Sequence, residues 1–390
     1  MAPAASSAKM GLLAAGAGAC VLLSPSSFVG PSSPALRSSR DGGQTPAVQS
    51  EAVGSAAPAS GSRVAGVPAA AAAAAGAMLL AASRRRAAVK PRGSLVAARD
   101  GASWGDNKYG ASSSLDTSGK IPFVKLTKGS DEAIVYLLGA SVTSYKTNGT
   151  EWLAVRPDAK LDGSKPISGG LPFCFPQFGP GEIQQHGFAR NLEWKLLEEP
   201  TDSGVCIMEL KDSEQTRAMW PHSFCCQYRV ELQEGKLATT FTVENTSASD
   251  FNFQAAMHSY YKVFDVNTCS IRGEFKGATK LDKTQTPPKL CKGDADTLKI
   301  SKFTEEIYKE VLPGTVVLTD PTKGDLGIIS GGGWKDVVIW SPYGDEVGNC
   351  KDKMGSERFV CIESAQVAPI PLAMGGKWTA TLELVPKPNK

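Results

Sequence analysis

Apolar and polar residues alternate on both sides of a tight turn, and this pattern constrains the fold more than any other feature. Every second residue of 224–232 is apolar, a polar turn follows at 233–236, and the alternation resumes over 237–243. A period of two residues is typical of strands with one buried face, so the segment predicts an antiparallel hairpin. Further strands are predicted at 334–340, 358–362 and 378–385, and two short strands, broken at Gly139, at 131–145.

The part of the chain after residue 99 contains many short strand patterns with Gly and Pro between them. No stretch of it keeps a helical apolar period beyond about two turns. This combination favours an all-β domain, a sandwich or a barrel. The polar segment 280–296, with its Pro-Pro step, is predicted to be an exposed loop.

Charge divides the chain into a basic leader and a mildly acidic body. Residues 1–99 hold ten basic and two acidic residues, which leaves 32 basic and 37 acidic residues in 100–390, a net charge of −5. The body has no basic patch large enough to indicate nucleic-acid binding. We predict a presequence at 1–99, a linker at 100–118 and one domain at 119–390, long enough to bury a substantial core.

The leader has the composition of a multipart targeting segment. An apolar run at 11–23 is typical of a signal-peptide core, and the uncharged stretch 64–83 ends at three arginines. With Phe28 and the hydroxylated, basic segment 32–63 between them, the order resembles algal presequences that direct proteins to a plastid. We therefore expect the chloroplast stroma as the location. The alternative is a single-pass anchor at 64–82, although that alanine-rich stretch is only weakly hydrophobic.

The nine cysteines form no Cys-x-x-Cys pair and have no histidine at metal-ligand spacing. Buried, reduced thiols are the expected state, and we expect no metal and no cofactor. The adjacent Cys225 and Cys226 would point to opposite faces of a strand.

Only three histidines are present. His186 lies four residues before Arg190, behind the Gly/Pro-rich segment 167–180, and such a pair suits an anionic, hydroxyl-rich ligand. His222 follows Trp220 and is predicted to pack or cap rather than catalyse.

His258 ends a second polar–apolar alternation, at 251–261. Read as a strand, it puts Phe251, Phe253, Ala255 and Met257 on one face, and Asn252, Gln254, His258 and Tyr260 on the other. The second face is polar but uncharged, as a sugar-binding cleft requires, because neutral amides and hydroxyls pair with ligand hydroxyls. Periodicity alone leaves a solvent-exposed sheet face equally open.

Glu363 follows the apolar run 359–362. Alternation places it on the face of Phe359 and Cys361, where burial would raise its pKa toward the range of a general base. The alternative is that the strand ends at Ile362 and leaves Glu363 in solvent.

Together these motifs resemble the glucose-6-phosphate 1-epimerase branch of the aldose 1-epimerase, or galactose mutarotase-like, family. The matching segments, in the family's order, are 139–145, 169–180, 186–190, 220–222, 257–260 and 360–363. The resemblance implies a large antiparallel β-supersandwich. It also implies acid–base opening of a sugar ring, rotation about C1–C2 and reclosure as the other anomer.

The resemblance also implies roles for individual residues. Glu363 is implied as the general base, His258 as the general acid at the ring oxygen and His186 as an orienting group. Arg190 is implied as a phosphate ligand, and Gln177 and Glu305 as substrate-binding residues.

Two positions depart from the family pattern. Ser168 stands where phosphate-specific members carry arginine, and Glu305-Glu306 replaces an Asp-Arg pair. Loss of one charge-assisted contact removes about 1.5–3 kcal/mol.

The prediction is thus a plastid mutarotase for a hexose 6-phosphate, glucose 6-phosphate above all. We expect a soluble monomer whose partner is a sugar or sugar phosphate, with membrane contact only through the presequence. The alternative is a non-catalytic, mutarotase-like binding or assembly subunit of a plastid complex.

Overall fold

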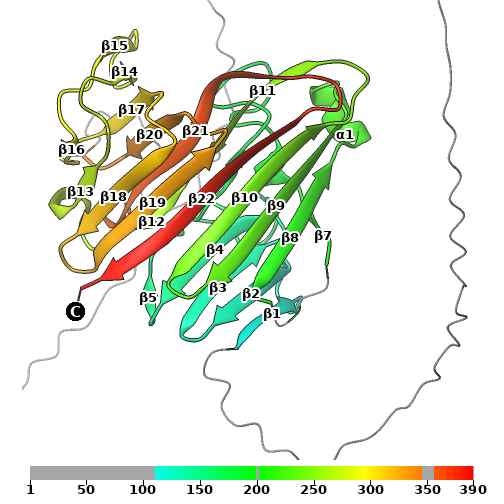
Figure 1. The fold of residues 1–390 in the computed structure, drawn as a ribbon, viewed down its shortest axis with the longest axis horizontal. Helices are drawn as coiled ribbons and strands as arrows, with labels where there is room; N and C mark the ends of the chain where they lie inside the picture. The colour runs from blue at the N-terminus through cyan, green and yellow to red at the C-terminus, as the bar shows by residue number, and fades with distance from the viewer. Residues whose placement is uncertain (1–109, 199–200, 202, 345–354, 390) are drawn as a thin grey trace, which may run out of the picture. The chain divides into compact units, whose positions relative to one another are not determined.

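Three antiparallel sheets make up the described part of the protein (Figure 1). The computed structural model describes residues 110–198, 201, 203–344 and 355–389. The presequence predicted at 1–99, and with it the plastid location, lies outside the described residues and stays a prediction.

The first sheet has five strands in sequence order. They are β1 (Ala111–Asp116), β2 (Phe123–Lys128), β3 (Asp131–Tyr136), β4 (Ser141–Thr147) and β5 (Thr150–Glu151). The break predicted at Gly139 is confirmed between β3 and β4. The linker predicted at 100–118 is wrong for residues 111–116, since β1 pairs with β2 along its whole length. This serine-rich edge strand buries little and so carries no apolar alternation.

The second sheet has nine strands and contains the predicted hairpin. Its order is β16 (Thr297–Leu298), β13 (Ser270–Arg272), β18 (Gly314–Asp320), β19 (Gly324–Gly332), β22 (Lys377–Pro388), β10 (Lys236–Asn245), β9 (Phe224–Gln233), β8 (Val205–Lys211) and β7 (Lys195–Leu196). Strands β9 and β10 pair from Lys236↔Gln233 onward. The alternation around the 233–236 turn is therefore confirmed.

The third sheet has eight strands. Its order is β15 (Lys289–Lys292), β14 (Thr279–Asp282), β17 (Thr304–Lys309), β20 (Asp336–Ser341), β21 (Phe359–Leu372), β11 (Phe251–Met257) and β6 (Phe173–Cys174), with β12 (Tyr260–Lys262) also paired to β21. The exposed loop predicted at 280–296 is wrong in part, because β14 and β15 form a hairpin there. Its strands hardly bury a face, and Leu290 is 62% exposed, so the burial pattern that reveals a strand is missing.

Helices are short in the described part of the chain. They are α1 (Glu214–Met219) and the 3₁₀ turns η1 (Ala189–Asn191), η2 (Val266–Thr268) and η3 (Ser356–Arg358). With six residues in α1, no helix of the described residues has the length and hydropathy needed to cross a membrane. The all-β fold class is confirmed.

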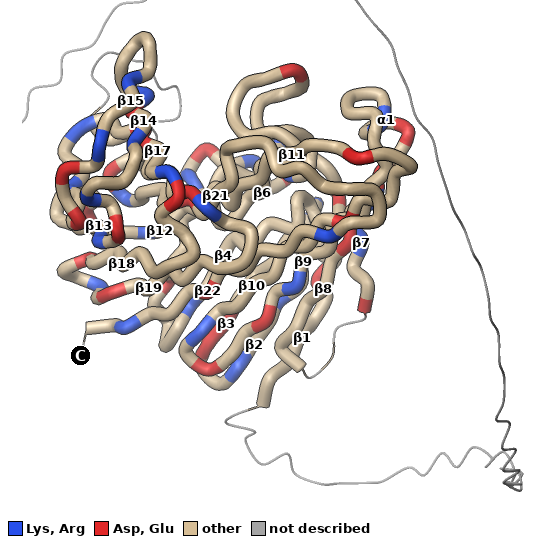
Figure 2. Tube along the Cα trace, turned by 45° about the horizontal axis from the view of Figure 1, so that its top comes forward, with Lys and Arg blue, Asp and Glu red and all other residues tan. Residues whose placement is uncertain are grey.

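The main core contains buried residues of all three sheets, such as Val135 of β3, Tyr228 of β9 and Ile339 of β20. Aromatic rings fill it: Phe173 of β6 packs edge-on against Tyr228 of β9, with ring centroids 4.7 Å apart, and lies 4.5 Å from Phe241 of β10. Six of the seven described cysteines are buried thiols, as predicted. On the outside, basic and acidic residues are interspersed along strands such as β2, β3 and β8 (Figure 2).

Candidate active site

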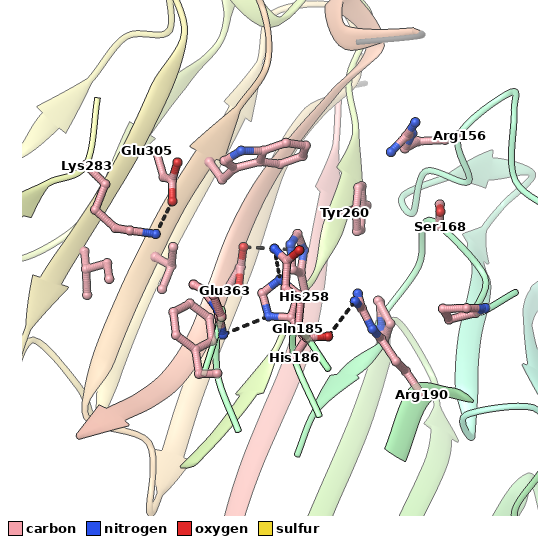
Figure 3. Close-up of a pocket in the computed structure, with 18 of the residues that line it drawn as sticks. Arg156, Ser168, Gln185, His186, Arg190, His258, Tyr260, Lys283, Glu305 and Glu363 are labelled. Carbon is pink, nitrogen blue, oxygen red and sulfur yellow. Dashed lines mark hydrogen bonds and ion pairs between the residues drawn. The ribbon is translucent and has the colours of Figure 1, made fainter. Parts of the chain in front are cut away.

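A cavity of about 380 Å³ opens on the eight-stranded sheet. Residues of β12, β17, β20 and β21 line it on the sheet side, and the segment 156–190 supplies most of the opposite wall. His258, Glu363 and His186 lie at its centre, with Arg156, Ser168 and Arg190 on one side and Lys283 and Glu305 on the other (Figure 3).

Glu363 lies within β21 rather than after it. The strand continues to Leu372, and Glu363 pairs with Val338 of β20 in the interior of the sheet. Its exposure is 2%, so the alternative of a solvated residue beyond the strand end is wrong. The Oε2 atom of Glu363 is buried and has no hydrogen-bond partner among the described residues.

His258 follows β11 in the short gap before β12. Its backbone N–H donates to the carbonyl of Pro172 at 2.9 Å, and its ring stacks on Tyr260 with centroids 5.0 Å apart. The predicted polar face is only half correct, because the register shifts between Phe253 and Ala255 and the strand ends at Met257.

The other two polar residues of that predicted face do not line the cavity. Asn252 is exposed. Gln254 donates to the carbonyl of Val367 at 2.6 Å and accepts from the backbone N–H of Phe178 at 3.1 Å. Gln254 therefore fixes the loop whose Phe178 side chain lines the cavity.

His258 and Glu363 form a buried pair, with Nδ1 and Oε1 3.4 Å apart. That distance is long for a hydrogen bond, and Nδ1 has no well-formed partner among the described residues. Burial, and then the charge of Glu305, raises the pKa of Glu363 well above its usual value. Burial, and then the nearby His186 and Arg190, lowers the pKa of His258. Both shifts favour the uncharged forms. The carboxyl group of Glu363 keeps its proton, the imidazole of His258 takes up no second proton, and the pair has no net charge.

His186 is held as a neutral hydrogen-bonding group. Its Nδ1 accepts the backbone N–H of Gly179 at 3.1 Å and lies 3.2 Å from Cys174 Sγ. Burial, and then the charges of Arg190 and Lys283, lowers the pKa of His186 to about 3. Because Nδ1 is the acceptor, the neutral ring carries its proton on Nε2, which lies 3.4 Å from the side-chain amide of Gln185.

The backbone of the loop is left-handed where it presents His186. The φ angle is 68° at His186 and 70° at Gly187. A Cβ atom on Gly187 would lie 2.1 Å from the carbonyl oxygen of Phe175, so only glycine fits. A left-handed histidine is uncommon, and such strain is concentrated at functional sites.

Arg190 lies on η1 and lines the cavity. One Nη2–H donates to the carbonyl of Gln185 at 3.2 Å, while Nε is buried without a partner among the described residues. Ser168 also lines the cavity. His186 and Arg190, the pair that suits an anionic ligand, therefore lie together at the cavity with Ser168.

Arg156 is a lining residue that the sequence interpretation missed. Its side chain is 3% exposed, and its Nε and Nη2 donate to the two carboxylate oxygens of Asp158 at 3.0 and 2.6 Å. Its backbone N–H donates to the carbonyl of Ser168 at 2.9 Å. The sequence does contain one signal for Arg156, which is a cation directly after the apolar run 152–155. A charge is rarely buried unless it has a partner or a function.

Lys283 and Glu305 form an ion pair on the other side of the cavity (Figure 3). Glu305 thus lies at the cavity, as the resemblance implies, whereas Glu306 accepts from Lys280 at 2.8 Å and from the Tyr308 hydroxyl at 2.7 Å. Lys283, which no sequence motif indicated, supplies a cation beside Glu305 at the cavity.

Gln177 and His222 do not line the cavity. Gln177 is bound within its own loop, donating to the Gly179 carbonyl at 3.1 Å and accepting from the Ile183 N–H at 3.2 Å. His222 packs against Trp220, with ring centroids 4.7 Å apart, as predicted.

Potential metal ligands also occur in the cavity. One ligand atom each of His258, Cys361 and Glu363 lies within 4.8 Å of the others. A cation bound there would contact both His258 and Glu363.

Comparison with known proteins agrees with the geometry. The family model for aldose 1-epimerase matches residues 122–385, and the chain belongs to that family of sugar epimerases. A protein of Cenchrus ciliaris named "Putative glucose-6-phosphate 1-epimerase" is 30% identical over 66% of this chain and 82% of its own length. A protein of the same name from Escherichia coli is 31% identical over 59% and 78%.

Solved structures share the fold. The crystal structure of a "putative mutarotase" from Salmonella typhimurium superposes with a TM-score of 0.59, at 24% identity, over 68% of this chain and 90% of that one. A galactose mutarotase related enzyme from Lactobacillus acidophilus gives 0.55, at 18% identity, over 69% and 97%. The galactose mutarotase-like supersandwich is therefore confirmed.

Proposed function

We propose that the protein interconverts the α and β anomers of a hexose 6-phosphate, with glucose 6-phosphate as the preferred substrate. The observation that carries the proposal is the buried His258–Glu363 pair, 3.4 Å apart, at the centre of a sugar-sized cavity. A buried carboxyl without a hydrogen-bond partner costs about 1–3 kcal/mol, a cost that an acid–base role explains.

The proposed reaction moves protons and consumes nothing. Glu363, as carboxylate, takes the proton of the C1 hydroxyl, while protonated His258 gives its proton to the ring oxygen and the C1–O5 bond breaks. Rotation about C1–C2 presents the other face of the aldehyde. On reclosure the C5 hydroxyl returns a proton to His258 and Glu363 returns one to O1, so the other anomer leaves and the pair is restored.

The environment of the pair suits this exchange. Its two forms, carboxylate with imidazolium and carboxylic acid with imidazole, both have zero net charge. Burial favours the second form, because the separated charges of the first form lose their hydration. The charges of Lys283 and Arg190 lower the pKa of Glu363 and so oppose the effect of its burial. These two cations favour the carboxylate form that the proposed reaction uses, while burial keeps the net pKa of Glu363 raised.

The rest of the cavity supports a phosphorylated sugar as ligand. The Nε2–H of His186 and the hydroxyl of Ser168 can bind neutral sugar hydroxyls, and the rings of Tyr260 and Trp340 form an apolar wall. Arg190 supplies a cation on the side away from the Lys283–Glu305 pair (Figure 3). No specific observation favours the alternative of a non-catalytic assembly subunit.

The test is the rate of anomer exchange measured by magnetisation-transfer NMR on glucose 6-phosphate and on glucose, with the purified protein and with Glu363→Gln. We expect exchange well above the buffer rate, faster with the phosphorylated sugar, and a loss of about 10²–10⁴ in the variant. Exchange at the buffer rate, or a variant as active as the parent protein, would overturn the proposal.

A further inference from the structure

We propose that Lys283 binds the C2 hydroxyl of the sugar, so that the protein selects its substrate partly by the group at C2. This inference rests on the proposed function and adds a substrate contact that no sequence motif indicated. Lys283 and its ion-pair partner Glu305 line one side of the cavity, and the acid–base pair lies at its centre (Figure 3). The position of Lys283 relative to that pair decides which part of a bound sugar it meets.

The sheet register sets the spacing between Glu305 and Glu363. Glu305 of β17 pairs with Trp340 of β20, and Val338, two residues before Trp340, pairs with Glu363 of β21. Two strand spacings, about 10 Å, therefore separate the strands of Glu305 and Glu363. Residues two apart on a strand share a face, and all four of these side chains line the cavity. A sugar ring that lies over β20 thus extends from the acid–base pair to Glu305.

Lys283 directly follows β14 and continues its pairing with β17. Its backbone N–H donates to the Glu305 carbonyl at 2.9 Å, and its ammonium group forms an ion pair with the Glu305 carboxylate. One residue therefore holds both the backbone and the side chain of Lys283 at the cavity. An ammonium group that is already held loses less conformational entropy when it binds a ligand.

The bonding of a pyranose ring decides which hydroxyl lies nearest to Lys283. In the proposed reaction the ring oxygen faces His258 and the C1 hydroxyl faces Glu363. C1 is bonded to the ring oxygen on one side and to C2 on the other, so C2 points away from His258. In the sheet, β21 lies between β11, which precedes His258, and the neighbouring strands β20 and β17. C2 and its hydroxyl therefore point toward β17, where the Lys283–Glu305 pair lies (Figure 3).

The charges of the Lys283–Glu305 pair suit a neutral hydroxyl. An ammonium group has three N–H donors, and a carboxylate has several acceptor sites. Glu305 accepts from Lys283, and no other acceptor for the Lys283 ammonium group occurs among the described residues. The pair thus offers a donor and an acceptor without net charge, which match the acceptor and the donor of one hydroxyl.

A second ion pair between the same strands provides a matched control. Lys280 of β14 forms an ion pair with Glu306 of β17, with Nζ and Oε1 2.8 Å apart. Neither of these residues lines the cavity. Lys280→Met and Lys283→Met therefore each leave one glutamate of β17 without its lysine, but only Lys283→Met removes a donor from the cavity.

The experiment compares kcat/KM for glucose 6-phosphate with kcat/KM for 2-deoxyglucose 6-phosphate, which lacks the C2 hydroxyl. The intrinsic reactivity of each sugar is the same with every protein, so a change in the ratio reports on the contact at C2. We expect the ratio to fall about 10–100-fold in Lys283→Met, the loss of one charge-assisted hydrogen bond, and to stay at the parent value in Lys280→Met.

Binding of analogues that cannot open their ring separates this inference from the proposed function. The two analogues are 1,5-anhydroglucitol 6-phosphate and its 2-deoxy counterpart, and titration calorimetry measures their affinities. If the protein exchanges no anomers but Lys283→Met loses the preference for the analogue with the C2 hydroxyl, the proposed function fails and the contact at C2 stands.

The fold of the variant needs its own control. If Lys283→Met does not fold, Lys283→Gln keeps a donor for Glu305 without the charge, and the same ratio should fall by a smaller factor. Unchanged preference for the C2 hydroxyl in the folded variant, in both kinetics and binding, would overturn the inference. An equal fall in Lys280→Met would also overturn it, because the effect would then come from the strands and not from the cavity.

Discussion

The acid–base pair and the cations beside it are held in different ways. Glu363 lies in the interior of β21, the longest described strand, and its backbone is fixed by neighbours on both sides. The cations Arg156 and Arg190 lie on the irregular segment between β5 and β7, held by side-chain contacts and a 3₁₀ turn.

This difference separates two tasks. In the proposed reaction, the groups that move protons lie within β21 and in the short gap between β11 and β12, where small displacements are costly. The cavity cations Arg156 and Arg190 lie on loops, which tolerate sequence change better than the sheet does. Arg156 and Ser168 line the same side of the cavity (Figure 3).

The largest expected effect is at the pair itself. His258→Asn should lower kcat for anomer exchange by about 10²–10⁴, because the ring oxygen loses its proton donor. The double variant with Glu363→Gln should be little slower than the slower single variant, since the two residues act as a unit. Polarimetry on fresh α-glucose 6-phosphate measures both, and multiplied losses would show that the residues act independently.

Removal of a cation from each side of the cavity should give unequal effects. Arg190→Met should raise the KM for glucose 6-phosphate by about 10–100-fold, the cost of one charge-assisted contact. Lys283→Met should cost less in phosphate binding, because Glu305 already compensates that charge. Steady-state kinetics on the two variants would contradict the assignment of sides if Lys283 had the larger effect.

The loop that presents His186 should tolerate less change than a surface turn. Gly187→Ala and Gly235→Ala meet similar φ angles, 70° and 65°, but only at Gly187 would the new Cβ clash, with Phe175. The left-handed conformation alone costs about 1–2 kcal/mol, so the free energy of unfolding should fall by that amount in Gly235→Ala. In Gly187→Ala it should fall clearly more, as measured by urea unfolding. Equal losses would mean that the loop relaxes freely.

The smallest expected effect is on stability in acid. The folded pKa of His186 is lowered from 6.5 to about 3, so between these values the unfolded chain binds the extra proton. The free energy of unfolding from this residue is fully present above pH 6.5 and is lost as the pH falls toward 3. When the pH falls from 6.5 to 5.5, the free energy of unfolding should drop by about 1 kcal/mol less in His186→Gln than in the parent protein. Urea unfolding at both pH values measures this drop. Equal drops in the variant and the parent protein would contradict a neutral, buried His186.

Much of the sheet could be predicted because burial leaves a period of two residues in the sequence. The hairpin at 224–243 follows from it, since its two strands have one face in the core, and the same alternation places Glu363 beside Phe359 and Cys361. The β14–β15 hairpin and β1 were missed because they bury little and so carry no such period.

The candidate site was predictable only in part. The resemblance supplied His258, Glu363, His186 and Arg190 as a set, and all four lie at one cavity. Arg156 could not be placed, because a single bridge between Val155 and Gly169 brings it there and an isolated contact leaves no pattern in the sequence. The exclusion of Gln254 likewise depends on one register shift within β11.

The separation of catalysis from ligand choice is tested most directly by kcat/KM of Glu363→Gln for glucose 6-phosphate and for glucose. The account predicts that both values fall by the same large factor, so that their ratio stays at that of the parent protein. A fall confined to one of the two sugars would contradict it, because Glu363 would then be selecting the ligand rather than moving the proton.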